Sequence, residues 1–403
     1  MSKNTKPKSA VEPQGKQITS TKSTTKQQKN QPRKGSVIKQ CMALDIAKDE
    51  IQICFRESLS DGSMRILAQK KVANTKSGWN MIDASIRKKL KSEAPQGFVV
   101  VMEATGVYHE NVCFFLNNQG YTINVCLPND TKFYIKSLGQ KSKNDKIDAQ
   151  ALAQMGLERQ LQVWVAPSAN VLNIKQLSRE RQLLIEEQTS AKNQLHAFKH
   201  KYEASKDGEK RFVARIKLLA KQIKEIDELL KQAIKADNDL KTKVKRICSI
   251  KGFGVISAII LLAETNAFTN FDNRAQLTSY AGYDVVENQS GNRVGKTRIS
   301  KRGNSRIRRC LFFPAFSAIC HDPTMKKLYE RVFERTKIKM KACVAVQRKM
   351  LLLAYAICKN ETDFDPQYQA KQAEKKAEKL PNQTDQLATN KNVDPTNGTT
   401  HPA

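Results

Sequence analysis

The pattern of apolar and polar positions from Gln40 onward predicts an α/β domain. Three short runs of strand-forming residues, separated by polar turns, come first: QCMALDIA, EIQICFRES and MRILAQKKVA. A helical stretch follows from Gly78 to about Ala94, and then a strand in GFVVVMEATG, a helix over NVCFFLNNQ and a strand in YTINVCLP. This order of strands and helices is typical of an α/β domain with a buried sheet.

The segment from about residue 170 to 245 is predicted to be helical, because it is nearly free of Gly and Pro and rich in Glu, Lys, Gln and Leu. Its apolar positions alternate steps of three and four: Ile216, Leu219, Ile223, Ile226, Leu230 and Ala233. This spacing forms a heptad seam. We expect two long helices joined near EASKDGEK, as an antiparallel hairpin or a coiled-coil dimer arm, or else a helical pair packed on its own domain.

The last folded segment runs from RICSIKGFGVISAIILLAE to about Lys359 and is predicted to be mainly helical, with a polar basic loop or hairpin in its middle. Both ends of the chain are too poor in apolar residues to offset their ordering entropy. The predicted organisation is a disordered basic arm at 1–38, an α/β domain at 39–165, a helical coiled-coil segment at 166–245, a mainly α domain at 246–360 and a disordered polar tail at 361–403.

The chain has a large excess of basic residues. Its 403 residues include 70 Lys+Arg and 39 Asp+Glu, which gives a formal net charge of +31. Because much of the excess falls in blocks, the phosphate backbone of a nucleic acid is the expected partner. A generally basic soluble protein is the plainer alternative.

The nine cysteines stand singly, without a C-x-x-C pair. This favours reduced thiols in a cytoplasmic protein and argues against a structural zinc site. No uninterrupted apolar run reaches about 18 residues, so we expect no membrane span. The N-terminus lacks the apolar core of a signal peptide.

Four acids lie at the ends or beginnings of the expected elements: Asp45, Glu103, Asp145 and Asp148. Asp45 lies between apolar neighbours in the first strand and Glu103 ends an apolar strand, where a carboxylate is costly to bury without a partner. Asp145 and Asp148 are three residues apart, so they share one face of a helix. Open α/β sheets gather ligands near strand ends, so we expect one cluster of four carboxylates.

Such a cluster would repel itself unless divalent cations neutralised it. Two Mg²⁺ or Mn²⁺ ions about 4 Å apart are the usual device of phosphodiester chemistry. The lysines around the helical pair, among them Lys141 and Lys143, would hold the phosphate backbone. Taken singly, the acids have plainer explanations, because an aspartate pair favours the start of a helix through its dipole and Glu103 precedes a glycine turn.

The second half of the chain contains two further nucleic-acid signals. In SIKGFGVISA, Gly252 and Gly254 have the spacing of helix-hairpin-helix modules, whose backbone N–H groups meet phosphate, although an ordinary helix-opening turn has the same pattern. A run of eight Lys/Arg without an acid follows, which predicts a nucleic-acid contact or a solvated basic face. The eight are Arg293, Lys296, Arg298, Lys301, Arg302, Arg306, Arg308 and Arg309.

Several of these motifs resemble one family. D-I-A in the first strand, E-A-T-G-x-Y at 103–108 and K-N-D-K-x-D-A at 143–149 resemble the DEDD transposases, insertion-sequence enzymes related to the Piv site-specific DNA invertase. QLTSYAGYDVVENQSGNRVGKTRISKRGNSRIRRCLF resembles the second, transposase domain of that family. The resemblance covers about residues 40–320. It implies a ribonuclease-H-like first domain similar to the resolvase RuvC, with the family's metal-binding acids at Asp45, Glu103, Asp145 and Asp148.

Ser290 is the nucleophile that the resemblance implies, since enzymes of this family use a serine of the second domain and the S-G of NQSG matches it. From the residues alone, a serine in a Gly-containing polar loop is a turn former. Ser300 and Ser305 are lesser candidates. A hydroxyl attacks phosphorus only when a base or metal takes its proton and cations accept the developing charge.

The favoured interpretation is a metal-dependent DNA transposase or recombinase that acts through a serine–DNA intermediate, as a homo-oligomer (dimer or tetramer) on two duplexes. The resemblance also implies a structured, element-encoded guide RNA. One alternative is a RuvC-like structure-specific nuclease, in which the acids activate water and Ser290 is structural. Another is a non-catalytic nucleic-acid-binding relative, against which the retention of all four acids counts.

Overall fold

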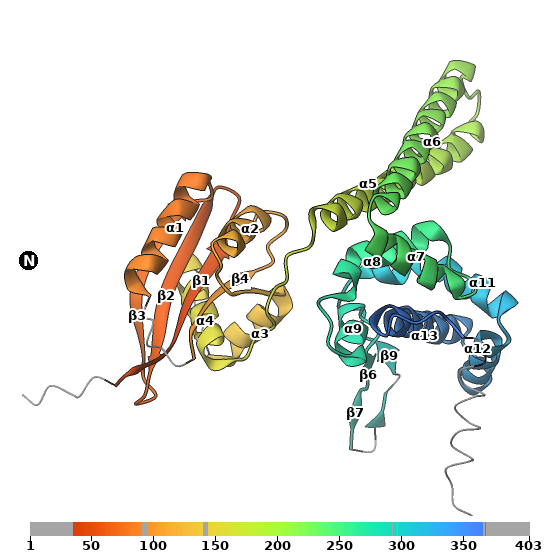
Figure 1. The fold of residues 1–403 in the computed structure, drawn as a ribbon. Helices are drawn as coiled ribbons and strands as arrows, with labels where there is room; N and C mark the ends of the chain where they lie inside the picture. Colours follow the sequence, from red (N-terminus) through yellow and green to blue (C-terminus); the bar gives the residue numbers. More distant parts are fainter. Residues whose placement is uncertain are drawn as a thin grey trace, which may run out of the picture. The chain divides into compact units, whose positions relative to one another are not determined.

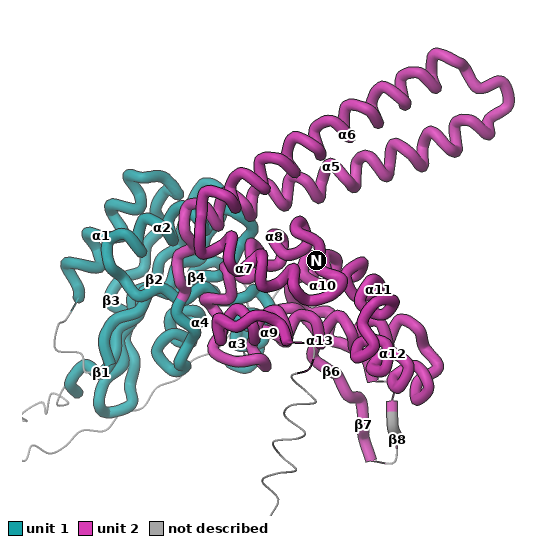
Figure 2. The backbone as a smooth tube through the Cα atoms, turned by 45° about the vertical axis from the view of Figure 1, so that its right-hand side comes forward, with its two compact units in different colours: residues 1–163 teal, residues 164–403 magenta. Residues whose placement is uncertain are grey.

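The computed structural model describes residues 35–90, 96–139, 144–291, 293–295, 297–365 and 367. The chain divides into two compact units, residues 1–163 (unit 1) and 164–403 (unit 2), which are coloured separately in Figure 2. Most of the basic arm predicted at 1–38 and of the polar tail predicted at 361–403 lies outside the described residues.

Unit 1 is built on a five-stranded sheet in the order β3-β2-β1-β4-β5. The strands are β1 (Val37–Ile46), β2 (Glu50–Leu59), β3 (Met64–Ala73), β4 (Phe98–Glu103) and β5 (Ile123–Cys126). β1 pairs antiparallel with β2, and β2 antiparallel with β3, whereas β4 is parallel to both β1 and β5. An antiparallel meander extended by two parallel strands is the sheet expected of a ribonuclease-H-like domain.

The described helices of unit 1 are α1 (Lys76–Lys89), α2 (Glu110–Asn118), α3 (Pro128–Ser137) and α4 (Asp145–Glu158) (Figure 1). α4 packs against β1, β2 and β4, with Ala149 and Leu152 in one core with Cys41 and Val101. Gly156 allows this close approach, because a Cβ there would lie 2.5 Å from the Cys41 sulfur and 2.7 Å from a Val101 methyl. Burial of this helix therefore depends on a residue without a side chain.

Unit 2 is mainly helical. Its described helices are α5 (Ala169–Lys199), α6 (Lys206–Lys235), α7 (Asn238–Ser249), α8 (Val255–Glu264), the short turn η1 (Asn266–Phe268), α9 (Arg274–Tyr280), α10 (Ser305–Cys310), α11 (Phe312–His321), α12 (Pro323–Thr336) and α13 (Lys339–Lys359). One apolar core joins Ile247 of α7, Leu261 of α8 and Met350 of α13. The apolar run in α8 is thus buried at a meeting point of several helices.

α5 and α6 form a hairpin that projects from the other helices of unit 2 in both views (Figures 1 and 2). The heptad seam of α6 is closed within the chain: Ile226 and Leu230 are buried in the same core against which Leu177 and Leu184 of α5 pack. Of the expected alternatives, the structure has the antiparallel hairpin. The seam is therefore not an exposed surface for a second copy.

Between α9 and α10 the chain forms a narrow hairpin of two-residue strands (Figure 1). Its strands are β6 (Val285–Val286), β7 (Gln289–Ser290), β8 (Arg293–Val294) and β9 (Arg298–Ile299). β6 pairs antiparallel with β9, and β7 antiparallel with β8, so the ladder has two steps and the second is the outer one. The polar basic segment predicted in the middle of this part is a hairpin.

Candidate functional site

Asp45 and Glu103 occupy neighbouring positions on two parallel strands. Leu44 of β1 is opposite Met102 of β4 in the register, and the next residue of each strand is one of the acids. Side chains two residues apart share a face of a strand. The residues two positions before the acids, Ala43 and Val101, pack in one core with residues of α4. Both partly exposed acids therefore lie on the face of the sheet that α4 covers, where the two strands end.

Glu103 is oriented by a residue of α3. The hydroxyl of Thr131 donates a hydrogen bond to Oε2 of Glu103. The same hydroxyl oxygen lies 3.0 Å from the carbonyl oxygen of Pro128, the first residue of the helix. Thr131 is only 2% exposed, so its side chain has little freedom to turn away. α3 thereby limits the rotamers of Glu103 before any ligand binds.

Asp145 and Asp148 lie in the first turn of α4. The side chain of Asn144 accepts a hydrogen bond from the backbone N–H of Ile147 at 2.9 Å, so Asn144 caps the helix and neither aspartate is needed for that purpose. Nζ of Lys71 lies 3.8 Å from Oδ2 of Asp145. A hydrogen bond to Glu50 and the charges of Glu50 and Asp145 raise the pKa of Lys71, so this ammonium stays protonated beside the aspartate.

The direction of α4 brings its aspartates to the same end of the sheet as Asp45. Gly156, near the end of α4, lies over the first half of β1. Asp145, at the beginning of α4, forms an ion pair with Lys71 of β3. In the register of the sheet, Lys71 is opposite Gln52 of β2, and Gln52 is opposite Asp45 of β1. α4 therefore runs antiparallel to β1, and four acids from three elements share one edge of the sheet. We call Asp45, Glu103, Asp145 and Asp148 the acid edge.

The acid edge has the donor chemistry of a Mg²⁺ or Mn²⁺ site, since all four side chains offer hard carboxylate oxygens. Among the described residues, however, no three carboxylate, imidazole or thiolate side chains are close enough to hold one ion. The acid edge thus offers suitable donor atoms, but in the described structure they do not form a coordination shell. Lys141 and Lys143, which precede α4 in the sequence, lie outside the described residues.

Ser290 lies in the outer step of the hairpin of unit 2. Its backbone pairs with that of Arg293 across a two-residue connection that begins with Gly291. Gly291 has a φ of +53°, a left-handed conformation that glycine adopts without strain. Ser290 is exposed, and no described residue forms a hydrogen bond with its hydroxyl. The hydroxyl is therefore accessible, but the described chain places no base beside it.

The two rival serines have local roles. The hydroxyl oxygen of Ser300 accepts a hydrogen bond from the backbone N–H of Arg302 at 3.3 Å, and this contact shapes the turn after β9. Ser305 is the first residue of α10, directly after Asn304, whose side chain caps that helix. Ser300 and Ser305 are consequently matched controls for Ser290.

The basic residues that follow Ser290 divide into two groups. The exposed group consists of Arg293, Arg298, Lys301, Arg302 and Arg306, and Nε of Arg306 lies 3.9 Å from Oε1 of Glu264. Arg308 instead donates hydrogen bonds to the carbonyl oxygens of Ala281, at 2.8 Å, and Lys301, at 3.2 Å. Arg309 forms an ion pair with Glu186 of α5. Lys296 lies outside the described residues.

The two glycines of the G-x-G pattern differ in what they do. Gly252 has a φ of +101°, and a Cβ there would lie 2.5 Å from the carbonyl oxygen of Pro314, so it is required for packing against α11. Gly254 precedes α8, is exposed, and has open space where its Cβ would be. No side chain caps this end of α8. Only Gly254 is therefore placed to leave helix N–H groups open to a ligand.

A buried acid that sequence reasoning missed organises this part of unit 2. Glu264 has a fully buried side chain that accepts two hydrogen bonds from Arg179 of α5, at 2.9 and 3.1 Å. Nδ2 of Asn304, the cap of α10, donates a third at 2.7 Å. Burial raises the pKa of Glu264, but the contacts with Arg179 and Asn304 lower it by more than burial raises it. The pKa of Glu264 therefore lies below the usual 4.5. Like Glu103, Glu264 ends an apolar run, and this shared pattern is the sequence signal that could have identified it as a buried acid.

Two broader observations concern the whole chain. All nine cysteines are free thiols. Burial raises the pKa of several of them, for example that of Cys54 to about 11, so these thiols remain protonated and unreactive at neutral pH. Within the described ranges, no helix combines the length and the apolarity needed to cross a membrane.

Comparison with known proteins agrees with these motifs. The family model described as "Transposase IS116/IS110/IS902 family" matches residues 244–330, and a DEDD-type model described as "Transposase" matches residues 42–202. The pilin gene-inverting protein of Moraxella bovis is 27% identical over 269 residues, which are 66% of this chain and 81% of that protein. The transposase of insertion sequence element IS1111A from Coxiella burnetii is 25% identical over 295 residues, with 66% and 79% covered.

Among solved structures, T. thermophilus RuvC in complex with a Holliday junction is 14% identical and covers 28% of this chain and 90% of its own, at a TM-score of 0.22. Strand order, and not this distant likeness, defines the fold of unit 1. Two family models that match in chain order, together with relatives that are transposases and DNA invertases, define the class: a recombinase enzyme. Over the two matched regions, the chain is similar to transposases of the IS116/IS110/IS902 type.

Proposed function

We propose that the protein is the transposase of an insertion sequence and that it cuts and rejoins DNA through a covalent serine–DNA intermediate. The observation that carries the proposal is the position of Ser290, an exposed hydroxyl in the outer step of a hairpin, with Arg293 and Arg298 on the strands that follow. Exposed cations beside a hydroxyl suit an attack on a phosphodiester, because they attract the backbone and offset its charge.

In the proposed step, Oγ of Ser290 forms a bond to phosphorus, loses its proton, and displaces one of the two ester oxygens of the DNA backbone. The number of phosphoester bonds is unchanged, so a free hydroxyl of another strand can later displace the serine and complete the exchange. Hydrolysis by water would leave no such bond to transfer. The proton needs an acceptor, and no described residue forms a hydrogen bond with this hydroxyl.

For the acid edge of unit 1 we propose the binding of a divalent cation. Mg²⁺ or Mn²⁺, held by Asp45, Glu103, Asp145 and Asp148, would supply the positive charge that acidifies a hydroxyl and stabilises charge on phosphate. The chain's own part is orientation: Thr131 holds Glu103, and Asn144 fixes the start of α4. Asp145 must exchange its contact with Lys71 for the ligand, which an exposed pair allows at little cost.

The proposal extends to partners. The DNA substrate and a structured guide RNA would both be attracted by the net charge of +31. The exposed basic residues after Ser290, Lys141 and Lys143 before α4, and the open end of α8 at Gly254 are the proposed contacts. We also propose a homo-oligomer, dimer or tetramer, because exchange between two duplexes needs more than one active site. Free thiols throughout suit the cytoplasm.

The test compares Ser290→Ala with Ser300→Ala in a recombination assay. Ser290→Ala removes one exposed oxygen, so folding and DNA affinity should be unchanged while recombination falls by several orders of magnitude, as it does when a nucleophile is removed. Ser300→Ala and Ser305→Ala should retain most activity. Full recombination by Ser290→Ala would exclude this serine from the mechanism.

A RuvC-like nuclease is the competing function, because all four acids lie in unit 1, whose sheet has a ribonuclease-H-like order. Such an enzyme would activate water at the acid edge and would not require Ser290. It predicts that Ser290→Ala still cleaves DNA and releases free ends. The proposed transposase mechanism predicts that the variant does neither.

A further inference from the structure

The outer half of the α5–α6 hairpin carries an unbalanced positive charge that the proposed chemistry does not use. A hydrogen bond from Gln188 of α5 to the carbonyl oxygen of Ile216 of α6 marks the level that divides the hairpin. Residues 188–217, the outer half, contain eight Lys/Arg and three Asp/Glu. The inner half, residues 169–187 and 218–235 taken together, contains seven Lys/Arg and six Asp/Glu. Charge along the hairpin is therefore concentrated at its outer end.

The acids of the outer half leave most of its cations without a carboxylate partner. Glu209 pairs with Lys199 at 2.6 Å, and Asp207 pairs with Lys210 at 3.0 Å. The basic residues that form no ion pair with a described residue are Lys192, Lys201, Lys206, Arg211, Arg215 and Lys217. Like charges without an opposite partner repel one another. A polyanion bound to the outer half would reduce that repulsion as well as gain contacts.

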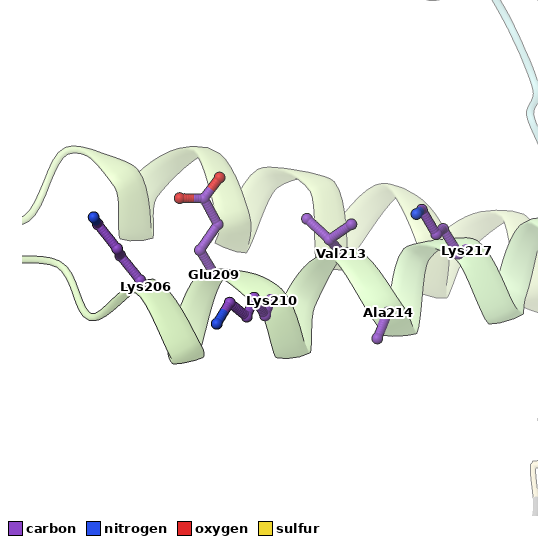
Figure 3. Close-up of a pocket in the computed structure, with 6 residues that line it drawn as sticks. All are labelled: Lys206, Glu209, Lys210, Val213, Ala214 and Lys217. Atoms are coloured by element: carbon purple, nitrogen blue, oxygen red, sulfur yellow. The ribbon is translucent and has the colours of Figure 1, made fainter.

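One face of α6 in this half forms a shallow surface pocket of about 470 Å³. Its lining, shown in Figure 3, combines Lys206, Lys210 and Lys217 with one acid, Glu209, and the apolar side chains of Val213 and Ala214. A small apolar strip flanked by ammonium groups can meet a sugar–phosphate backbone, since the sugar has an apolar surface and the phosphates lie on both sides of it. The pocket extends along the helix as a backbone-binding surface would.

The tip of the hairpin adds an aromatic side chain. Tyr202, in the turn between α5 and α6, is 92% exposed, and Lys201 precedes it. An aromatic ring presented to solvent beside cations is a residue type found where proteins contact bases and sugars. The ends of α5 and α6 beside this turn pack closely together, because Phe198 packs on Phe212 and a Cβ at Gly208 would lie 2.4 Å from the Phe198 ring.

We propose that the outer half of the hairpin, residues 188–217, is a DNA-binding arm that grips the duplex backbone away from the serine hairpin. DNA is the partner because a recombinase must hold duplex outside the bonds it cuts, and a 30-residue helix spans about 45 Å. The arm contacts phosphates through Lys206, Arg211 and Lys217, and Tyr202 contacts the groove or sugar at its end. This site is independent of Ser290 and of the acid edge.

The test measures binding of the full-length protein to a linear mixed-sequence DNA duplex over a range of salt concentrations. The variant Lys206→Gln/Arg211→Gln/Lys217→Gln changes exposed side chains only, so its thermal unfolding should match that of the parent. Each lost phosphate contact lowers the slope of log affinity against log salt by about 0.9, so the slope should fall by about 2 to 3. Tyr202→Ala should weaken binding several-fold without changing the slope.

The matched control is Lys221→Gln/Lys224→Gln/Lys235→Gln, which removes the same charge from exposed positions in the inner half of α6. It should leave the slope within a fraction of one contact of the parent's. If the outer and inner variants lower the slope equally, binding depends on total charge and not on the outer half of the hairpin, and the proposal is overturned. A loss confined to a structured RNA probe, with DNA binding intact, would also overturn it, because RNA would then be the partner. Ser290→Ala should keep the full slope, whichever way its recombination assay turns out.

Discussion

At the residue scale, Glu103 shows how the fold orients a single carboxylate. It ends a strand in which the three preceding residues are fully buried, and it accepts a hydrogen bond from the hydroxyl of Thr131 of α3. Asp45 lies at the adjacent position of the neighbouring strand. Carboxylates that converge on one site repel each other unless a cation is present, and this is the reason for proposing a divalent ion there.

Amide substitution tests this arrangement. Asp45→Asn, Glu103→Gln, Asp145→Asn and Asp148→Asn each remove one negative charge from the acid edge, so each should weaken Mn²⁺ binding measured by titration calorimetry. Asp61→Asn is the control, because Asp61 lies in the turn between β2 and β3 at the other end of the sheet, bound to Ser63. Mn²⁺ binding that is unaffected by all four substitutions would remove the metal site from the account.

The elements illustrate which features a sequence pattern can predict. Runs of alternating or continuous apolar residues mark β1 to β5, because strand burial has a period that is visible locally. α3 escaped prediction, since PNDTKFYIKS is short and mostly polar, although Pro128 begins the helix. The bond between Arg179 and Glu264 joins residues 85 positions apart, and no local pattern records it. The four acids were recognisable as a motif, whereas the pairing of Asp145 with Lys71 required the fold.

Glu264 provides the prediction at the scale of elements, since it connects α5, α8 and α10. Glu264→Gln removes one partner of a buried ion pair and should lower the free energy of unfolding by about 3 kcal/mol at neutral pH, measured by urea denaturation. Glu209→Gln is the control, because its pair with Lys199 is exposed and should contribute less than about 1 kcal/mol. Equal losses in the two variants would show that Glu264 does not organise the unit.

The pH dependence of that difference has a definite sign. Because the folded-state pKa of Glu264 is lowered from 4.5, its stabilisation is complete above that value. It is lost as the pH falls through the lower, folded-state pKa, where the carboxylate becomes protonated. The stability gap between the parent and Glu264→Gln should therefore be constant from neutral pH to about 5 and should close in more acidic solution. A gap that widens on acidification would contradict the ion-pair explanation.

At the scale of the whole molecule, charge is the dominant property. Residues 1–34, which precede the described residues, hold nine Lys/Arg and one Glu. Deleting them should leave thermal unfolding unchanged, because the segment carries few apolar residues, and should lower the salt dependence of nucleic-acid binding. A deletion variant that binds with the parent's slope of log affinity against log salt would show that this segment does not contact phosphate.

The central claim, a serine–DNA bond formed by Ser290, is tested most directly by trapping that bond. The protein would be incubated with DNA from the ends of its element, the flanking RNA and Mg²⁺, denatured and digested with protease, and the DNA-linked peptide would be identified by mass spectrometry. The account predicts one adduct, on the peptide that contains NQSG and at Ser290, which is absent from Ser290→Ala and present in Ser300→Ala. An adduct on another residue, or cleaved DNA with free ends and no adduct, would contradict it and support the nuclease.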